Sequence, residues 1–305
     1  MKVIDQFVSN LYVGEPQEFE QLRVAPVFVR EDRPFPYLDL EEALKRQVVE
    51  VTEVSEQGSV PSLRVTNTGD LDVIVLDGEE LIGAKQNRIV NTTIIVPARS
   101  TVEIPVSCVE ARRWGYTSRS FATSANPSYS SLRARKHSSV TASLRETGTH
   151  TSNQSEIWGD IAGKSSRLRS YSPTSSMSDM FDTTISPEAD RQIVEQIPHS
   201  EGQVGYLAFV RGGFAGGDVF GSAELCRGKL RKFVRGHYLD ALDEGVRFPA
   251  ITVEEVIAQV RAAQQEQFAT VGKGSEVRFE ARDVQGTWKL VDDLIPHLLV
   301  LPKLN

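Results

Sequence analysis

The sequence predicts an α+β protein with an antiparallel β-sandwich or barrel-like N-terminal half and helices inserted and packed in the C-terminal half. Short β-rich runs separated by Pro, Gly and Asp fill residues 1–110. A Ser- and Arg-rich stretch with helical spacing follows, and the last third alternates between helices and strands. We therefore divide the chain into a β-rich part (1–110), a helical insertion (111–185) and an α+β part (186–305) that packs with 1–110 as one domain.

Strands in the β-rich part are recognised by their alternation and by the turn residues between them. Strand spacing of this kind is typical of sandwiches and barrels. The last strand alternates most regularly and places Cys108 on its apolar face, while Pro105 favours an edge position or a bulge. Leu38–Arg46 suits a short helix. The predicted strands are Val24–Arg30, Gln47–Val54, Ser62–Asn67, Asp72–Leu76, Glu80–Arg88, Thr92–Val96 and Thr101–Cys108.

The middle of the chain is polar and strongly basic. Its low complexity would suggest disorder, but apolar residues at helical spacing in Ser130–Thr147 and around Trp158 predict two or three helices joined by polar loops. Residues 111–170 carry ten Lys or Arg against three Asp or Glu, which leaves about −14 for the rest because the total is −7. This segment could receive a phosphate group or dock against the acidic remainder, and both alternatives stay open.

The C-terminal part contains clear helix starts. Ser186 and Pro187 are typical of the N-cap and first position of a helix, which we extend to Ile197. Ser222 caps a long helix to Leu242, and Thr252-Val-Glu-Glu255 is a capping box that opens a helix to about Phe268. The remaining predictions are a strand at Gly205–Val210, a turn at GGFAGGD, a return strand from Val219, and strands at Glu276–Ala281, Thr287–Val291 and His297–Leu301.

Composition excludes several classes of protein and site. No apolar run approaches the roughly 20 residues that span a bilayer, and the N-terminus lacks a signal-peptide core, so we expect a cytoplasmic protein without a membrane segment. Cys108 and Cys226 are too few for a disulfide framework and are expected to be buried thiols. The five histidines show no metal-ligand spacing, so no histidine-rich metal site is predicted and no residue is assigned as a metal ligand. Gly163-Lys164-Ser165 lacks the earlier glycine of a phosphate-binding P-loop.

The most unusual part of the sequence is a polar strand after Asp77-Gly78, which we predict as a tight hairpin turn. Charged and amide residues interrupt the returning strand where apolar residues would be expected. Strand parity places Glu79, Lys85, Asn87 and Asn91 on one face and Glu80, Gln86 and Arg88 on the other. This pattern indicates either a ligand site built on rigid strands or a hydrogen-bonded network that specifies the fold.

If the polar strand is a site, its residue types indicate their roles. Carboxylates perform acid-base chemistry or bind a divalent ion, Lys and Arg hold anionic oxygens, and Trp stacks on a base. Simple cross-strand ion pairs, each worth about 0.2–1 kcal/mol, are the structural alternative. The candidate catalytic residues are Glu79, Glu80 and Glu110, and the candidate ligand-binding residues are Lys85, Gln86, Asn87, Arg88, Asn91 and Trp114.

Two blocks of the sequence also carry a family resemblance. VLDGEELIGAKQNRIVNTTIIVPARSTVEIPVSCVEARRWGY and GQVGYLAFVRGGFAGGDVFGSAELCRGKLRKFVRGHYLDAL resemble the bacterial ARG-and-rhodanese/phosphatase-superfamily-associated protein domain family, over nearly the whole chain. The resemblance implies a setting of nucleotide or ADP-ribose metabolism, because the family is named for gene associations with ADP-ribosylglycohydrolases and rhodanese or phosphatase-type proteins. It implies no particular reaction. The matching positions are Gly78, Glu79, Glu80, Gly83, Ala84, Lys85, Gln86, Asn87, Arg88, Asn91, Cys108, Glu110 and Trp114.

Three functions follow from these observations, and the sequence identifies no particular cofactor. The first is binding of a phosphate-bearing small molecule such as a nucleotide or an ADP-ribose derivative, with hydrolysis or transfer on it as an extension. The second is a non-catalytic scaffold that binds a protein partner, in which the polar strand is a structural network. Nucleic-acid binding through the basic segment ranks third, because the overall charge is negative and no RNA-binding motif is present.

Overall fold

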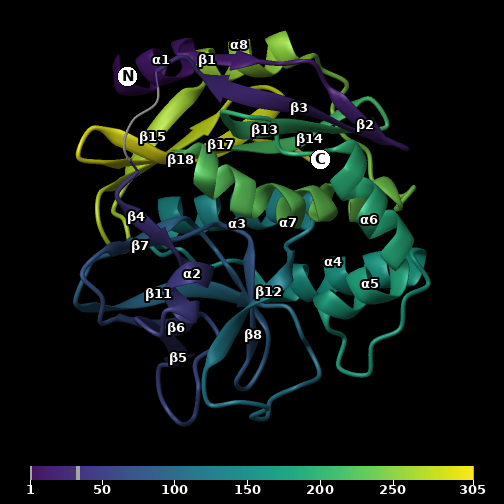
Figure 1. Cartoon of the computed structure of the whole chain (residues 1–305). Coiled ribbons are helices and arrows are strands. Elements are labelled where there is room, and N and C mark those ends of the chain that lie inside the picture. The colour runs from purple at the N-terminus through teal and green to yellow at the C-terminus, as the bar shows by residue number, and fades with distance from the viewer. Residues whose placement is uncertain (1, 32–34, 305) are drawn as a thin grey trace.

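The computed structural model, which describes residues 2–31 and 35–304, confirms the α+β class. Figure 1 shows a large sheet across the top of the molecule, helices α3 and α7 below it, and smaller curled sheets at the bottom. Helices α4, α5 and α6 lie along one side, while α1 and α8 cover the outer face of the large sheet. None of the helices in the described part of the chain is long and apolar enough to cross a membrane.

The large sheet joins the two ends of the chain. Its nine strands follow the order β1-β3-β13-β14-β18-β17-β16-β15, with β2 also paired to β3, and all pairings are antiparallel. The pairing of β3 with β13 ties the first thirty residues to the C-terminal part. The strands are β1 (Leu11–Val13), β2 (Gln17–Phe19), β3 (Leu22–Val29), β13 (Gln203–Val210), β14 (Gly213–Phe220), β15 (Gln264–Phe268), β16 (Ser275–Glu280), β17 (Val284–Val291) and β18 (Leu294–Pro302).

The other strands of the N-terminal half form two smaller, curled sheets, which we together call the half-barrel. The six-stranded sheet has the order β12-β8-β9-β11-β6-β5, and the three-stranded sheet has the order β10-β7-β4. Strand β11 lies between β9 and β6 and not at an edge; Pro105 is the last residue in register with β6. The strands are β4 (Tyr37–Asp39), β5 (Val49–Glu53), β6 (Ser62–Asn67), β7 (Asp72–Val75), β8 (Glu79–Gly83), β9 (Arg88–Val90), β10 (Ile94–Val96), β11 (Ser100–Cys108) and β12 (Phe121–Pro127).

Helices begin where the sequence offers capping residues. The predicted caps are confirmed: Ser186 accepts from the Ala189 N–H, Ser222 accepts from the Leu225 N–H, and Thr252 forms a complete capping box with Glu255. The polar middle segment holds three helices, as predicted. The helices are α1 (Lys2–Ser9), α2 (Leu40–Lys45), α3 (Ser130–Thr147), α4 (Gln154–Arg167), α5 (Met177–Thr184), α6 (Pro187–Gln196), α7 (Ala223–Ala241) and α8 (Val253–Ala262).

Two C-terminal predictions are wrong in detail. The helix expected to reach Phe268 ends at Ala262, and the next residues form edge strand β15 because they pair with β16. Only Gly212 of the GGFAGGD run lies in a turn, with a positive φ of 78°, because Gly213–Asp218 belong to strand β14. A Cβ on Gly217 would lie 2.3 Å from the carbonyl oxygen of Tyr206, so this glycine permits close strand approach.

The predicted hairpin at Asp77-Gly78 is also wrong. Gly78 has the expected positive φ of 77°, but β7 pairs with β4 and β10 whereas β8 pairs with β9 and β12, so the turn links two sheets. Furthermore, the run Glu80–Arg88 is not one strand, because the chain reverses between β8 and β9. Strand parity therefore does not carry across residues 84–87, and the two predicted faces do not form.

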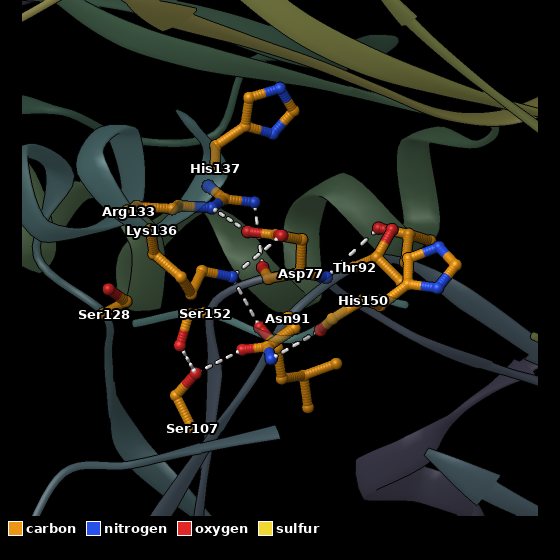
Figure 2. A network of polar contacts seen from close by, with 12 residues as sticks. Asp77, Asn91, Thr92, Ser107, Ser128, Arg133, Lys136, His137, His150 and Ser152 are labelled. Atoms are coloured by element: carbon orange, nitrogen blue, oxygen red, sulfur yellow. Dashed lines mark hydrogen bonds and ion pairs between the residues drawn. The ribbon is translucent and has the colours of Figure 1, made fainter. Parts of the chain in front are cut away.

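A buried ion network holds the layers together. Arg133 of α3 donates from Nε to Asp77 Oδ1 at 2.9 Å, and its two terminal nitrogens donate to Asp218 of β14 at 2.8 and 2.9 Å. Lys136 donates to the other oxygen of Asp77 at 2.9 Å and to the Val90 carbonyl at 2.6 Å. Figure 2 shows the Asp77, Arg133 and Lys136 side chains converging. All four charged groups are at most 3% exposed, so each depends on the others to offset its desolvation.

We predict that Arg133→Leu lowers the free energy of unfolding by about 3–5 kcal/mol, because it leaves Asp77 and Asp218 buried without their main partner. Urea unfolding followed by circular dichroism measures the change. The control is Arg135→Leu on the same helix, whose half-exposed pair with Asp160 should cost at most about 1 kcal/mol. Equal effects of the two substitutions would contradict a special role for Arg133.

Candidate functional site

The structure divides the predicted site residues into three sets: four near the surface, two buried at the same turn, and three buried elsewhere. Lys85, Asn87, Glu110 and Trp114 lie at or just below the surface, where the turn between β8 and β9 meets the loop after β11. Gln86 of this turn and Arg88, the first residue of β9, are buried. The other three, Glu79, Glu80 and Asn91, are completely buried and point to three different neighbours elsewhere in the protein.

Arg113 holds the turn and the loop together. Its guanidinium pairs with Glu110 at 2.6 Å and donates to the Ala84 carbonyl at 2.7 Å and to Asn87 Oδ1 at 3.0 Å. Glu110 in turn accepts from the Asn87 N–H at 3.1 Å. Burial alone would raise the pKa of Glu110, but hydrogen bonds from Arg113, Thr174 and this amide lower it below its ordinary value. Arg113 was not among the predicted site residues, because only the fold brings its partners together.

The accessible part of this site is a cationic and aromatic surface. The Lys85 ammonium lies 5.4 Å from the ring centroid of Trp114 and 5.0 Å from that of Tyr116, and it donates to the Gln57 carbonyl at 2.8 Å. The two aromatic residues are 50% and 54% exposed, which is unusual for side chains of this size. Tyr116 was not among the predicted site residues. We call Lys85, Trp114 and Tyr116 the aromatic surface.

Arg88 supplies a positive charge beneath the aromatic surface. Its guanidinium carbon lies 5.6 Å from the Trp114 ring centroid, and Nη1 donates to both the carbonyl and the side-chain oxygen of Gln86 at 3.0 Å. Its closest carboxylate, Glu53, is 3.9 Å away, and Nε has no hydrogen-bond partner within the described residues. Burial lowers the pKa of Arg88. Gln86 also donates to the Glu110 carbonyl, so it connects Arg88 to the loop.

Glu79 belongs to a buried ion cluster with helix α7. Its Oε1 accepts from Lys229 at 2.8 Å and from Lys232 at 3.3 Å, while its Oε2 accepts from the Leu76 N–H at 3.2 Å. Burial would raise the pKa of Glu79, but the two lysines and the amide lower it to about 2. Lys229 also pairs with Asp39 at 2.7 Å. This carboxylate therefore joins the half-barrel to α7.

Glu80 is buried in a different environment, against helix α5. Ser178 donates a hydrogen bond to Oε2, and Oε1 has no partner among the residues that the structure describes. Burial raises the pKa of Glu80 to about 7, although the hydroxyls of Ser178 and Ser124 act in the opposite direction. Of the three candidate catalytic carboxylates, this one has a pKa suited to proton transfer near neutral pH.

Asn91 lies in the polar network of Figure 2, on the side of the half-barrel that faces α3 and α4. It donates from Nδ2 to the His150 carbonyl at 2.9 Å and accepts from Ser107 at 2.6 Å. The Ser107 hydroxyl is also bonded to that of Ser152. His150 continues the network to Glu276 in β16, at 3.0 Å. Asn91 thus links the half-barrel to the large sheet.

Much of the basic segment pairs with acidic residues elsewhere in the chain. Besides Arg133 and Lys136, and apart from the pair of Arg113 with the adjacent Glu110, three of its cations reach carboxylates outside residues 111–170, which favours the docking alternative for these residues. Arg112 and Arg119 are exposed in the loop that carries Trp114 and Tyr116. The three further pairs are Lys164 with Asp240 and Asp243, Arg167 with Asp243, and Arg145 with Glu266 and Glu280.

The two cysteines are buried free thiols, as predicted. Burial raises the pKa of Cys108 to about 11, although the nearby Arg88 acts in the opposite direction. His237 is buried with Nε2 3.3 Å from the Tyr206 hydroxyl, and burial lowers its pKa to about 4. These features are structural and lie outside the aromatic surface.

We predict that Glu80→Gln stabilises the protein more as pH rises. Burial raises the pKa of Glu80 from 4.5 to about 7, so the folded state favours the protonated carboxyl. The contribution of Glu80 to the free energy of unfolding therefore declines as pH rises from 4.5 to 7, by about 3 kcal/mol in total. Unfolding free energies of the variant and the parent between pH 5 and 8 test this. The control Glu79→Gln should instead destabilise at pH 7, because the folded state favours ionised Glu79. A pH-independent effect of Glu80→Gln would contradict the raised pKa.

We predict that Cys108 reacts slowly with iodoacetamide in the folded protein at pH 8, because the thiol is buried and only a small fraction is thiolate. Peptide mass spectrometry after timed alkylation, with and without urea, measures the protection. Cys226, also buried, is the internal control and should react only in urea. Rapid alkylation of Cys108 alone would make it a candidate nucleophile.

Comparison with known proteins supports the family resemblance of the sequence. The model of the family described as ARG and Rhodanese-Phosphatase-superfamily-associated Protein domain matches residues 10–301. The match includes the turn, the loop and every predicted site residue. Neither a curated protein nor a solved structure matches the chain significantly. The chain therefore belongs to the ARG and Rhodanese-Phosphatase-superfamily-associated protein domain family.

Proposed function

We propose that the protein binds a phosphate-bearing small molecule, such as a nucleotide or an ADP-ribose derivative, at the aromatic surface. One observation carries the proposal: half-exposed Trp114 has the Lys85 ammonium within 5.4 Å of its ring centroid and the Arg88 guanidinium within 5.6 Å. An exposed aromatic face stacks on a base, and neighbouring cations attract phosphate oxygens. The family name, which refers to a phosphatase superfamily, is loosely consistent with phosphate chemistry.

The charge around the aromatic surface favours an anion. Five cations, Lys85, Arg88, Arg112, Arg113 and Arg119, lie in or beside the turn and loop, against the three carboxylates Glu53, Glu56 and Glu110. This local excess of positive charge contrasts with the net charge of −7 for the whole chain. An anionic ligand would therefore be attracted to this surface in preference to most of the protein.

The surface is also held in position before any ligand arrives. Arg113 fixes the loop through the Ala84 carbonyl, Asn87 and Glu110, and the Tyr116 hydroxyl donates to the Glu56 carbonyl at 3.3 Å. A fixed loop loses little conformational entropy on binding, which increases affinity. This gives the predicted residues Asn87 and Glu110 a positioning role, with Lys85 and Trp114 in contact with the ligand.

The geometry supports binding more strongly than catalysis. Glu79 is neutralised by two lysines, and Glu80, the carboxylate with the most suitable pKa, is fully buried against α5. Glu110 is the candidate carboxylate nearest the aromatic surface, but it is engaged by Arg113 and the Asn87 amide. A non-catalytic scaffold is the second candidate function, favoured by the burial of Glu79 and Asn91 inside bonded networks.

We predict that ADP-ribose or AMP quenches the fluorescence of Trp114 on binding, and that Trp114→Ala weakens the affinity about tenfold or more, because stacking on an aromatic ring contributes about 1–3 kcal/mol per base. Lys85→Gln should weaken binding and reduce its salt dependence. Fluorescence titration measures the quenching, and isothermal titration calorimetry at two salt concentrations measures the affinities and their salt dependence.

The matched control for the binding test is Tyr12→Ala, which removes a comparably exposed aromatic residue from β1 and should leave the affinity unchanged. If ADP-ribose, AMP and NAD all fail to bind the folded parent protein, the proposal is wrong. Binding that survives both Trp114→Ala and Lys85→Gln would place the phosphate site elsewhere.

A further inference from the structure

We propose that Glu80 is a proton-sensitive contact that couples helix α5 to the loop after β11 (residues 109–120) and thereby regulates the aromatic surface. A buried side chain that changes its charge can shift the balance between two arrangements of the segment that packs on it. This regulation rests on the proposed function, because the regulated site is the aromatic surface. The coupling itself requires no ligand.

The first turn of α5 packs directly on Glu80. This side chain of β8 is completely buried, and its Oε2 accepts a hydrogen bond from Ser178. Its Oε1 has no partner within residues 2–31 and 35–304. A neutral carboxyl loses far less than a carboxylate when it is buried with incomplete hydrogen bonding. Ionisation of Glu80 therefore acts against the packing of α5 on β8.

The groups that face Glu80 do not offset a negative charge. Burial is the main cause of its raised pKa, while Lys232 of α7 lowers the pKa and Glu110 of the loop raises it. The Lys232 ammonium is paired with Glu79 at 3.3 Å. Helix α5 and strand β12 face Glu80 with the hydroxyls of Ser178 and Ser124 and not with cations. The protonated carboxyl is therefore the form that suits this environment.

The start of α5 also holds the loop after β11. The Arg112 N–H donates to the Thr174 carbonyl at 2.9 Å, and the Met177 N–H donates to the Val109 carbonyl at 2.9 Å. An antiparallel β-bridge lies between these two bonds. The same loop carries both rings of the aromatic surface. Movement of α5 away from Glu80 therefore removes the bonds that fix the first part of this loop.

The direction of the pH effect follows from the two states of Glu80. Its pKa is about 7 with α5 in place, against an ordinary value of 4.5 for a carboxyl that is released to water. Because the packed state has the higher pKa, protonation stabilises it, fully below pH 4.5 and progressively less as pH rises to about 7. Between these values the ratio of packed to released α5 falls about tenfold per pH unit.

Hydrogen–deuterium exchange of the full chain at pH 6 and 7.5, corrected for intrinsic exchange rates, tests the coupling. We expect peptides from α5 to lose about tenfold in protection over this range, and peptides from residues 109–116 to lose protection with them. Glu80→Gln, which is neutral at both pH values, should abolish the change. The control Asp182→Asn removes an exposed carboxylate of the same helix and should retain it.

A second variant tests the contact without changing a charge. Ser178→Ala removes the hydrogen bond between α5 and Glu80 and should reduce the protection of both segments already at pH 6. The coupling is wrong if the protection of α5 changes equally with pH in the parent and in Glu80→Gln. It is also wrong if α5 loses protection while residues 109–116 do not.

Isothermal titration calorimetry with ADP-ribose, whose diphosphate has the same charge at both pH values, tests the regulation. We expect the parent to bind up to about tenfold more weakly at pH 7.5 than at pH 6, and Glu80→Gln to bind equally at both. An equal loss of affinity in both proteins would overturn the regulation. If ADP-ribose binds neither protein, regulation of its binding is also wrong, and the exchange experiment still decides whether Glu80 couples α5 to the loop.

Discussion

The ion network centred on Arg133 is the interaction on which the rest of the structure depends. Its guanidinium comes from the polar middle segment, whereas Asp77 comes from the N-terminal half and Asp218 from the C-terminal part. The Arg133 side chain thus connects the middle segment to both the N-terminal half and the C-terminal part. Because each charge is buried, removal of any one leaves an uncompensated ion in the core, which is far more costly than loss of a surface pair.

Buried ion pairs between segments recur throughout the molecule and explain how a segment rich in Ser and Arg can fold. Lys164 pairs with Asp240 and Asp243, and Glu79 pairs with Lys229, each across a contact between helices or between a sheet and a helix. A different packing of the segments would leave some of these buried charges without their partners. We infer that the networks specify how the layers pack, while the apolar clusters beside them supply most of the favourable burial.

Local features of the fold could be predicted from the sequence because local rules determine them. The helix caps at Ser186, Ser222 and Thr252 and the buried register of Cys108 depend on neighbouring residues alone. Strand parity failed beyond β8 because the chain reverses at residues 84–87; Gly83 and Ala84 both have positive φ there, 121° and 38°. The partner sheet of a strand is a long-range property, so β7 and β8 could not be assigned to different sheets in advance.

The candidate site shows the same division between local and long-range information. The sequence identified the unusual residues around the turn, and Lys85, Asn87, Glu110 and Trp114 do come together. It could not separate them from Glu79, Glu80 and Asn91, because burial depends on α5, α7 and the His150 loop, which are distant in sequence. A polar motif therefore contains residues of two kinds: some hold the fold and some remain available at the surface.

Pairing also determines which charges remain available to ligands. Arg133, Lys136 and Lys164 are paired inside the protein and are not available to a phosphate group, whereas Arg112 and Arg119 remain exposed beside Trp114. The total charge of the 111–170 segment is therefore a poor guide to where a phosphate would bind. The charge that remains after internal pairs are removed is a better guide, and beside Trp114 it favours the anionic ligand that we propose.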